Sequence, residues 1–228
     1  MPLLPVLAAQ GLAVRSRARL LPEPEGARSG RAGRGPNLRL LILGDSSAAG
    51  VGAGTQAQAL SGQLVARLGR HYAVQWRLEA ATGRTTADAL AALERVDGPI
   101  DMAVTALGVN DVTRGVSRTR FADRQAVLLD RLATMGARRI VVSGVPPMER
   151  FPALPQPLAW VLGRQAARLD GALAALASAR PHVEHLHFDM PEDPALAASD
   201  GYHPSPRAYA LWAEQISGAL IDRSRRAS

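Results

Sequence analysis

The 228-residue sequence contains no cysteine and no lysine, and only 4% of its residues are aromatic. Without cysteine the chain forms neither a disulfide nor a thiolate-ligated metal site. Without lysine it cannot supply the lysine of a nucleotide-binding P-loop. Because proteins that bind single-stranded nucleic acid combine basic residues with stacking aromatic residues, the scarcity of aromatics excludes this class. We therefore expect no nucleic-acid partner, although the arginines give the chain a net charge of +7.

The sequence also lacks a long apolar run. Residues 1–14 are apolar but are interrupted by Pro2, Pro5 and Gly11, and the arginines follow this segment instead of preceding it. A secretory signal carries its positive charge first, and a transmembrane helix needs about 20 apolar residues. We therefore expect a cytoplasmic protein rather than a secreted one. Residues 1–20 are the one segment expected to allow membrane contact, as an interfacial anchor, and an arm packed on the protein surface is the alternative.

Length and composition fit a single folded domain, since 47% of the residues are hydrophobic. Residues 22–36 are rich in glycine, proline, arginine and glutamate, which predicts an extended or mobile linker. The chain is accordingly divided into an N-terminal arm and linker over 1–37, a folded domain over 38–222 and a basic tail over 223–228.

Short apolar or alternating segments predict five β-strands, and helical periodicity occupies the intervals between them. The predicted strands are residues 40–43, 72–80, 100–107, 138–145 and 183–188. The predicted helices are residues 56–68, 86–93, 118–135, 158–176 and 206–222. Because strands alternate with helices, right-handed crossovers are expected to join the strands into a parallel sheet that is covered on both faces. The predicted fold class is therefore α/β.

Polar and glycine-rich segments follow the predicted strands at one edge of this sheet, where open α/β sheets bind their ligands. Ser46 follows the first strand, Gly83 the second and Asn110 the third, while Asp200 and His203 follow the fifth. A serine hydroxyl becomes a nucleophile when an imidazole takes its proton, and an acid orients that imidazole. Asp200 and His203 share one short loop, so the fold has only to bring Ser46 to His203.

The same strand ends offer donors for an oxyanion: the backbone N–H groups of Ser46 and Gly83 and the side-chain amide of Asn110. Each residue also has a purely structural interpretation, as a helix cap, a strand end or a turn. Asp45 and Asp111 are interpreted as hydrogen-bond acceptors that fix their loops. The combination of nucleophile, base, acid and oxyanion donors nevertheless predicts acyl-transfer chemistry.

Four segments carry a family resemblance: Gly44-Asp45-Ser46-Ser47, an isolated Gly83, Gly108-Val109-Asn110-Asp111 and Asp200-Gly201-Tyr202-His203-Pro204. In this order they resemble the four sequence blocks of the SGNH hydrolases, also called the GDSL esterase/lipase family. The resemblance implies that Ser46 is the nucleophile, His203 the general base and Asp200 its partner. It further implies that Ser46, Gly83 and Asn110 form the oxyanion hole.

The resemblance covers residues 38–219 and implies a flavodoxin-like, three-layer α/β/α sandwich with a five-stranded parallel sheet. It leaves residues 1–37 uncovered and makes 38–222 the catalytic domain. The family usually has leucine where this chain has Ser47, a difference expected to affect local packing or pocket shape and not the chemistry.

We expect a serine esterase that hydrolyses carboxylic esters of small to medium acyl chains through an acyl-enzyme, without a cofactor. The expected partner is a small-molecule ester. Whether it is a simple ester, a thioester, a lysophospholipid or an acetylated sugar stays open, as does the oligomeric state. The alternative is a catalytically inactive sandwich that binds an acyl or glycan ligand.

The loop over residues 146–157 follows the fourth strand on the catalytic side. Its apolar residues Met148, Phe151 and Leu154 are expected to bind substrate by shaping an acyl pocket, and a plain surface connection is the alternative.

Three other kinds of site fit the sequence poorly. A loose dinucleotide fingerprint begins at Gly52, which comes too late after the strand to form the tight phosphate-binding turn. The G-x-S-x-G elbow of α/β-hydrolases fails at Ala48. Finally, His182, His185 and His187 lack a clear carboxylate ligand, so no metal site is expected.

Overall fold

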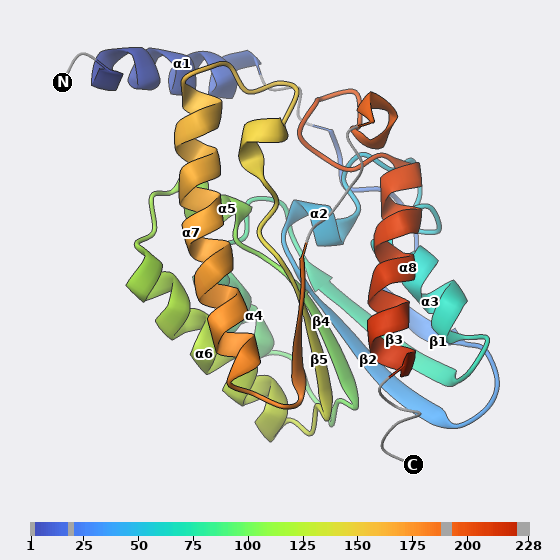
Figure 1. Ribbon diagram of the computed structural model, residues 1–228. Helices are drawn as coiled ribbons and strands as arrows, with labels where there is room; N and C mark the ends of the chain where they lie inside the picture. Colours follow the sequence, from blue (N-terminus) through green and yellow to red (C-terminus); the bar gives the residue numbers. More distant parts are fainter. Residues whose placement is uncertain (1–2, 18–20, 188–192, 223–228) are drawn as a thin grey trace.

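A six-stranded sheet with helices on both faces forms the centre of the molecule, which is seen here in a computed structural model that describes residues 3–17, 21–187 and 193–222 (Figure 1). The strands are β1 (Ser29–Ala32), β2 (Asn37–Gly44), β3 (Ala73–Ala80), β4 (Met102–Ala106), β5 (Arg139–Ser143) and β6 (Val183–Leu186). Their order in the sheet is β1-β3-β2-β4-β5-β6. The five strands β2 to β6 are parallel, in the flavodoxin-like order, as expected.

The strand count differs from the prediction because β1 adds a sixth strand, antiparallel to β3, at the edge of the sheet. Its sequence, SGRA, has neither apolar residues in alternation nor β-branched residues, so periodicity gives no signal for it. It forms because the outer edge of β3 presents unpaired backbone groups, which an adjacent extended segment satisfies.

Five helices agree with the predicted periodic segments, the helix over residues 3–17 was not predicted, and short extra helices follow two of the strands. The helices are α1 (Leu3–Arg17), α2 (Ser46–Ala49), α3 (Leu60–Leu68), α4 (Thr86–Leu93), α5 (Val109–Thr113), α6 (Arg118–Thr134), α7 (Leu158–Ser178) and α8 (Pro206–Asp222). Two 3-10 turns, η1 (Met148–Arg150) and η2 (Pro194–Leu196), complete the set. The short α2, α5 and both 3-10 turns are too brief for a helical period to reveal them. Phe188, the last residue of the predicted fifth strand, lies outside the described residues.

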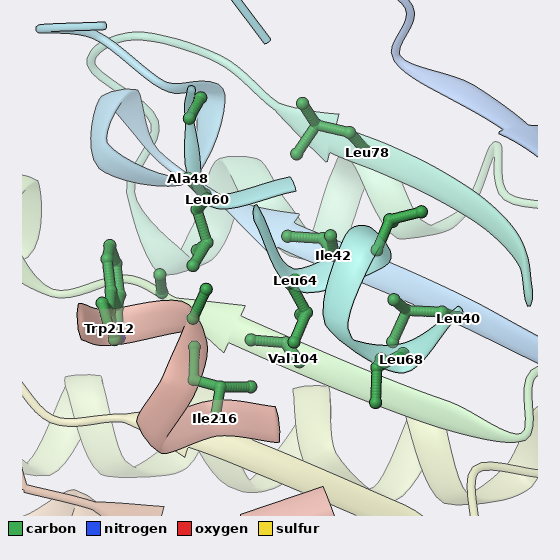
Figure 2. Close-up of a cluster of buried hydrophobic side chains, with 14 of the residues drawn as sticks. Leu40, Ile42, Ala48, Leu60, Leu64, Leu68, Leu78, Val104, Trp212 and Ile216 are labelled. Atoms are coloured by element: carbon green, nitrogen blue, oxygen red, sulfur yellow. The ribbon is translucent and has the colours of Figure 1, made fainter. Parts of the chain in front are cut away.

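The alternating side chains of β2 divide the core into two layers. Leu40 and Ile42 pack with α3 and α8 on one face (Figure 2), whereas Leu41 and Leu43 pack with α4, α6 and α7 on the other. All four side chains are buried, because a central parallel strand is covered on both faces. Because β2 is buried on both faces, its direction is fixed, and so is the position of the residues that follow Gly44.

The segment before β2, which was predicted to be an extended or mobile linker, contains β1 and is bonded to the sheet. Glu23 accepts hydrogen bonds from the backbone and side chain of Thr82, at 2.7 and 2.9 Å, and pairs with Arg28 at 2.9 Å. The backbone N–H of Gln56 donates to the carbonyl of Glu25. The proposed division at residue 37 stays a prediction, and the tail over 223–228 lies outside the described residues. Among the helices described, none has the length and apolar character that crossing a bilayer demands.

Candidate active site

Ser46 stands at the sharp turn between β2 and α2. A Cβ at Gly44 would lie 2.5 Å from both the carbonyl oxygen of Ala106 and the Cβ of Ala48, so only glycine permits this close approach. Asp45 caps α2 by accepting a hydrogen bond at 3.0 Å from the N–H of Ser47. The turn therefore holds Ser46 at the carboxyl edge of the sheet, as the first residue of α2.

Asp200 and His203 come from the loop that precedes α8. One carboxylate oxygen of Asp200 accepts the backbone N–H groups of Tyr202 and His203, at 3.0 and 3.1 Å. Its other oxygen lies 2.6 Å from Nδ1 of His203. Gly201 makes this tight loop possible by adopting a φ of +71°. The Asp200 side chain is almost fully buried, and the His203 ring is partly exposed.

The fold brings this loop to Ser46, which is 157 positions earlier in the sequence. Nε2 of His203 lies 2.9 Å from the hydroxyl oxygen of Ser46. Because the Asp200 carboxylate can only accept at Nδ1, it places the ring proton there and leaves Nε2 as the acceptor for the serine hydroxyl. The three side chains that the sequence predicted to act together thus lie in one hydrogen-bonded series.

The environment of Asp200 favours its ionised form. Burial by itself raises the pKa of this carboxyl, but the N–H of Tyr202 and the side chain and backbone of His203 stabilise the charge, and the net effect is a lowered pKa. A permanently charged carboxylate beside Nδ1 suits an imidazole that becomes positively charged during a reaction.

The predicted oxyanion donors lie around the same turn. The N–H of Ser46 is in the first turn of α2, where a helix provides no internal partner. Gly83 has a φ of +79°, with open space where a side chain would stand. Nδ2 of Asn110 donates to the carbonyl of Arg84 at 3.1 Å and to the carboxylate of Asp45 at 3.4 Å. Asn110 is therefore held between the residue after Gly83 and the residue before Ser46.

Asp45 and Asp111 fix loops through hydrogen bonds, which confirms their structural interpretation. Asp111 is buried and accepts from the backbone and hydroxyl of Thr86, at 3.0 and 2.9 Å. Burial, as the largest cause, raises the pKa of Asp45 to about 7, against the opposing hydrogen bond from Ser47, and the charge of Asp111 adds to the rise. A titratable group thus directly precedes Ser46.

A pocket with a volume of about 510 Å³ lies beside His203 and Ser47. All three predicted substrate-binding residues, Met148, Phe151 and Leu154, pack in the core layer on the α7 side of the sheet, and of these Phe151 also lines the pocket. Ser47 lines the pocket, in agreement with its expected influence on pocket shape. Other residues also line the pocket and were not predicted, among them Pro146, Leu196, Tyr202, Ala208 and Trp212.

His185 and His187 form a second polar cluster around Asp170 of α7, which does not include His182. Oδ1 of Asp170 lies 2.8 Å from Nε2 of His185 and also accepts the N–H of Val145 at 2.8 Å. Oδ2 lies 3.5 Å from Nδ1 of His187. Within the residues that the structure describes, no group of three or more histidine, cysteine or acidic side chains is placed to hold a metal ion. The cluster instead connects α7 and β6 to the loop after β5 that lines the pocket.

Comparison with known proteins gives matches over most of the chain. Residues 42–211 match the GDSL-like lipase/acylhydrolase family. A GDSL-like esterase of Mycobacterium tuberculosis is 34% identical over 200 residues, which cover 82% of this chain and 62% of that protein. The match therefore spans less than two thirds of the length of that relative.

Solved structures share the fold at lower sequence identity. A psychrotrophic esterase from Pseudoalteromonas sp. has a TM-score of 0.63 and 18% identity, and the match covers 82% of this chain and 98% of that one. A lipase/acylhydrolase from Enterococcus faecalis has a TM-score of 0.57 and 19% identity, with 82% and 96% covered. The fold, the family match over residues 42–211 and the order of the four sequence blocks lead to one assignment. The chain belongs to the GDSL-like lipase/acylhydrolase family, the SGNH hydrolases.

Proposed function

We propose that the protein is a serine esterase that hydrolyses carboxylic esters of small to medium acyl chains through an acyl-enzyme, without a cofactor. The observation that carries this proposal is the hydrogen-bonded series from Asp200 through His203 to the hydroxyl of Ser46. In this proposal residues 38–222 are the catalytic domain. The name of the mycobacterial relative, an esterase, supports a small-molecule ester as the substrate.

In the first half of the reaction, Oγ of Ser46 attacks the ester carbonyl carbon while Nε2 of His203 accepts the hydroxyl proton. Asp200 stabilises the imidazolium that results. The tetrahedral intermediate then collapses, the bond to the alcohol oxygen breaks, and Nε2 donates its proton to that oxygen. The alcohol departs and the acyl group remains on Ser46.

In the second half, a water molecule takes the place of the alcohol. Nε2 of His203 accepts a proton from this water as its oxygen attacks the acyl carbon. Collapse of the second intermediate breaks the bond to Oγ of Ser46, which regains a proton from the imidazolium. The acid leaves, and the enzyme returns to its starting state without any external reactant except water.

Both tetrahedral intermediates carry a negative oxygen, for which the proposed donors are the N–H groups of Ser46 and Gly83 and the amide of Asn110. The Asn110 amide is already oriented by its hydrogen bond to the carbonyl of Arg84, at 3.1 Å. Its contact with Asp45 is longer, at 3.4 Å, and is the one that an oxyanion would replace. A donor that is oriented before the reaction stabilises the developing charge at little cost in reorganisation.

The pocket supports an apolar acyl group. Its wall contains Leu107, Phe151, Leu196 and Trp212, and its volume of about 510 Å³ is within the range of small-ligand sites. His203 lies at this wall, so an acyl chain in the pocket would have its carbonyl carbon near Ser46.

The test is release of p-nitrophenol from acetyl, butyryl and octanoyl esters, with a metal chelator present. Wild type is compared with Ser46→Ala and with Ser178→Ala, a control at the exposed end of α7. We expect turnover by wild type and by the control, and a loss of about a thousandfold or more in Ser46→Ala. Folded wild-type protein without turnover on all three esters would favour the inactive binding module instead.

A further inference from the structure

Helix α1 has no polar face. Its residues from Leu3 to Val14 include no charged side chain, and none of the described side chains from 3 to 16 is buried. Four large apolar side chains are among its exposed ones: Leu3 at 54%, Leu4 at 64%, Val6 at 44% and Leu12 at 70%. Helices that are apolar around their whole circumference are normally buried in protein or in lipid. The described part of the chain does not bury the exposed apolar side chains of α1, so we expect another molecule or a lipid surface to contact them.

The helix is attached to the protein body at the start of α7. Gln10 donates its side-chain amide to the carbonyl of Gln156 at 2.6 Å and accepts the N–H of Leu158 at 3.1 Å. Figure 1 shows α1 crossing the end of α7 and extending beyond it. Near this crossing, Trp160 in the first turn of α7 is 59% exposed. Leu3, Leu4, Val6, Leu12 and Trp160 together are called the α1 surface below.

Positive charge borders the α1 surface. Arg15, near the end of α1, is exposed, and the sequence from 1 to 22 contains no acidic residue. On α7, Arg164 and Arg168 follow Trp160 at successive turns and are exposed, and no acidic residue occurs from 157 to 169. Tryptophan is enriched where proteins meet the interface of a membrane, and arginine next to it suits a surface of anionic lipids. Each arginine near such a surface adds electrostatic attraction.

The α1 surface lies at the catalytic end of the molecule. In Figure 1, α1 is at the same end as α2, which contains Ser46, and as the start of α8, which follows the loop of Asp200 and His203. The loop between β5 and α7 connects the two features directly. It contributes Phe151 to the wall of the pocket and, five residues later, Gln156 to the attachment of α1.

We propose that the α1 surface binds the surface of an anionic lipid bilayer, with α1 lying among the headgroups and Trp160 beside it. Binding in this way covers the apolar side chains, pairs the flanking arginines with lipid phosphates, and places the catalytic end of the molecule near the membrane. The proposal goes beyond the esterase function and does not depend on it, because lipid binding requires neither Ser46 nor His203.

The first experiment is co-sedimentation of the full chain with phosphatidylcholine vesicles, with and without phosphatidylglycerol, at low and high salt. We expect binding to the anionic vesicles, weakened by salt. Leu12→Glu should reduce this binding about tenfold or more, because it removes a leucine that the bilayer would bury and adds a negative charge. The matched control is Val127→Glu, which places the same charge at an exposed apolar residue of α6 and should bind as wild type does.

The second experiment uses tryptophan fluorescence. Trp212 is buried and Trp76 is partly buried, so Trp160 is the tryptophan that vesicles would move from water to lipid. We expect a blue shift of emission on addition of anionic vesicles, and no such shift in Trp160→Phe. Circular dichroism of each variant establishes that it is folded.

Two results would overturn the proposal. One is equal binding of wild type and Leu12→Glu to the vesicles. The other is a failure of wild type to bind while light scattering shows a dimer that Leu12→Glu dissociates, since a second copy of the chain would then cover α1.

Discussion

The side-chain amide of Asn110 lies 3.4 Å from the carboxylate of Asp45, the residue directly before Ser46. Asp45 is buried, and its pKa of about 7 means that its charge changes near neutral pH. A protonated Asp45 leaves the Asn110 amide facing a neutral carboxyl, whereas an ionised Asp45 holds that amide more strongly and adds negative charge beside the proposed oxyanion position. The state of Asp45 therefore influences both folding and the proposed chemistry.

The first prediction concerns stability and pH. The pKa of Asp45 rises from 3.8 in the unfolded chain to about 7 in the folded protein, so between these pH values the folded state keeps a proton that the unfolded state has lost. This group therefore lowers stability as the pH rises through that window. In Asp45→Asn the decline should be less steep, by at most about 1.4 kcal/mol per pH unit. Urea unfolding at several pH values measures the slopes, and parallel curves for the two proteins would contradict the prediction.

A second prediction concerns Asn110 as an oxyanion donor. Asn110→Ala removes the side-chain amide and should lower kcat about a hundredfold to a thousandfold, with a smaller change in KM. Steady-state kinetics on p-nitrophenyl butyrate provide the measurement. Thr113→Ala is the control, because its exposed hydroxyl bonds back to the carbonyl of Asn110 on the same short helix. An unchanged kcat in folded Asn110→Ala would remove this residue from the oxyanion hole.

A third prediction concerns the acid of the proposed triad. Asp200→Asn keeps the shape of the side chain but can donate a hydrogen bond to Nδ1 of His203, which favours the wrong tautomer. We expect kcat to fall about ten-thousandfold, as expected when a triad acid loses its charge. The measurement is single-turnover acylation by p-nitrophenyl acetate. If acylation proceeded at the wild-type rate, His203 would not need Asp200 to orient it.

A fourth prediction concerns the cluster at Asp170. Burial alone raises the pKa of this carboxyl, but the hydrogen bond and charge of His185 outweigh it, together with the N–H of Val145, so the net pKa is lowered. The stability that Asp170 contributes is therefore present above its unfolded pKa and is lost as the pH falls through the folded value. Asp170→Asn should be less stable than wild type at neutral pH, and the difference should shrink in acid. Thermal unfolding across the pH range tests this, and a constant difference would contradict it.

A fifth prediction concerns chain-length preference. Phe151 lines the pocket, so Phe151→Ala removes apolar surface that would contact the distal part of an acyl chain. We expect kcat/KM for an octanoyl ester to fall about tenfold, with little change for an acetyl ester. Leu154→Ala serves as a comparison, since Leu154 packs on the core away from the pocket. Equal losses on both esters would place Phe151 outside the acyl site.

The parallel sheet could be predicted because its central strands are buried on both faces and therefore appear as short continuous apolar runs. β2 illustrates this: Leu40 to Leu43 meet the core on alternate sides. β1 gave no such signal, since its role is to satisfy backbone groups at the edge of β3, and any extended segment can do so. The position of α1 could not be predicted either, because its residues lack the periodicity that identifies a buried face.

The grouping of Ser46, Asp200 and His203 could also be predicted, because the carboxyl ends of parallel strands meet at one edge. Apart from Phe151 and Ser47, the residues that line the pocket could not be predicted to do so. Met148 and Leu154 are as apolar as Phe151, and all three pack on the core, but of these only Phe151 also lines the pocket. Trp212 lies on the apolar face of α8, where a pocket residue and a core residue look alike in the sequence. Asp170 was missed because its partner, His185, is on a different element.

The contact between Ser46 and His203 spans 157 positions of the chain, whereas Asp200 and His203 are three positions apart. During synthesis on a ribosome, the serine emerges first, and the acid and the base emerge together much later. A nascent chain therefore holds an unactivated hydroxyl until the segment before α8 has left the exit tunnel and α8 has packed on α3 and β5. In the proposed function, ester hydrolysis would then report completion of folding, and truncation before the loop of Asp200 and His203 would leave Ser46 without its base even if the sheet had already formed.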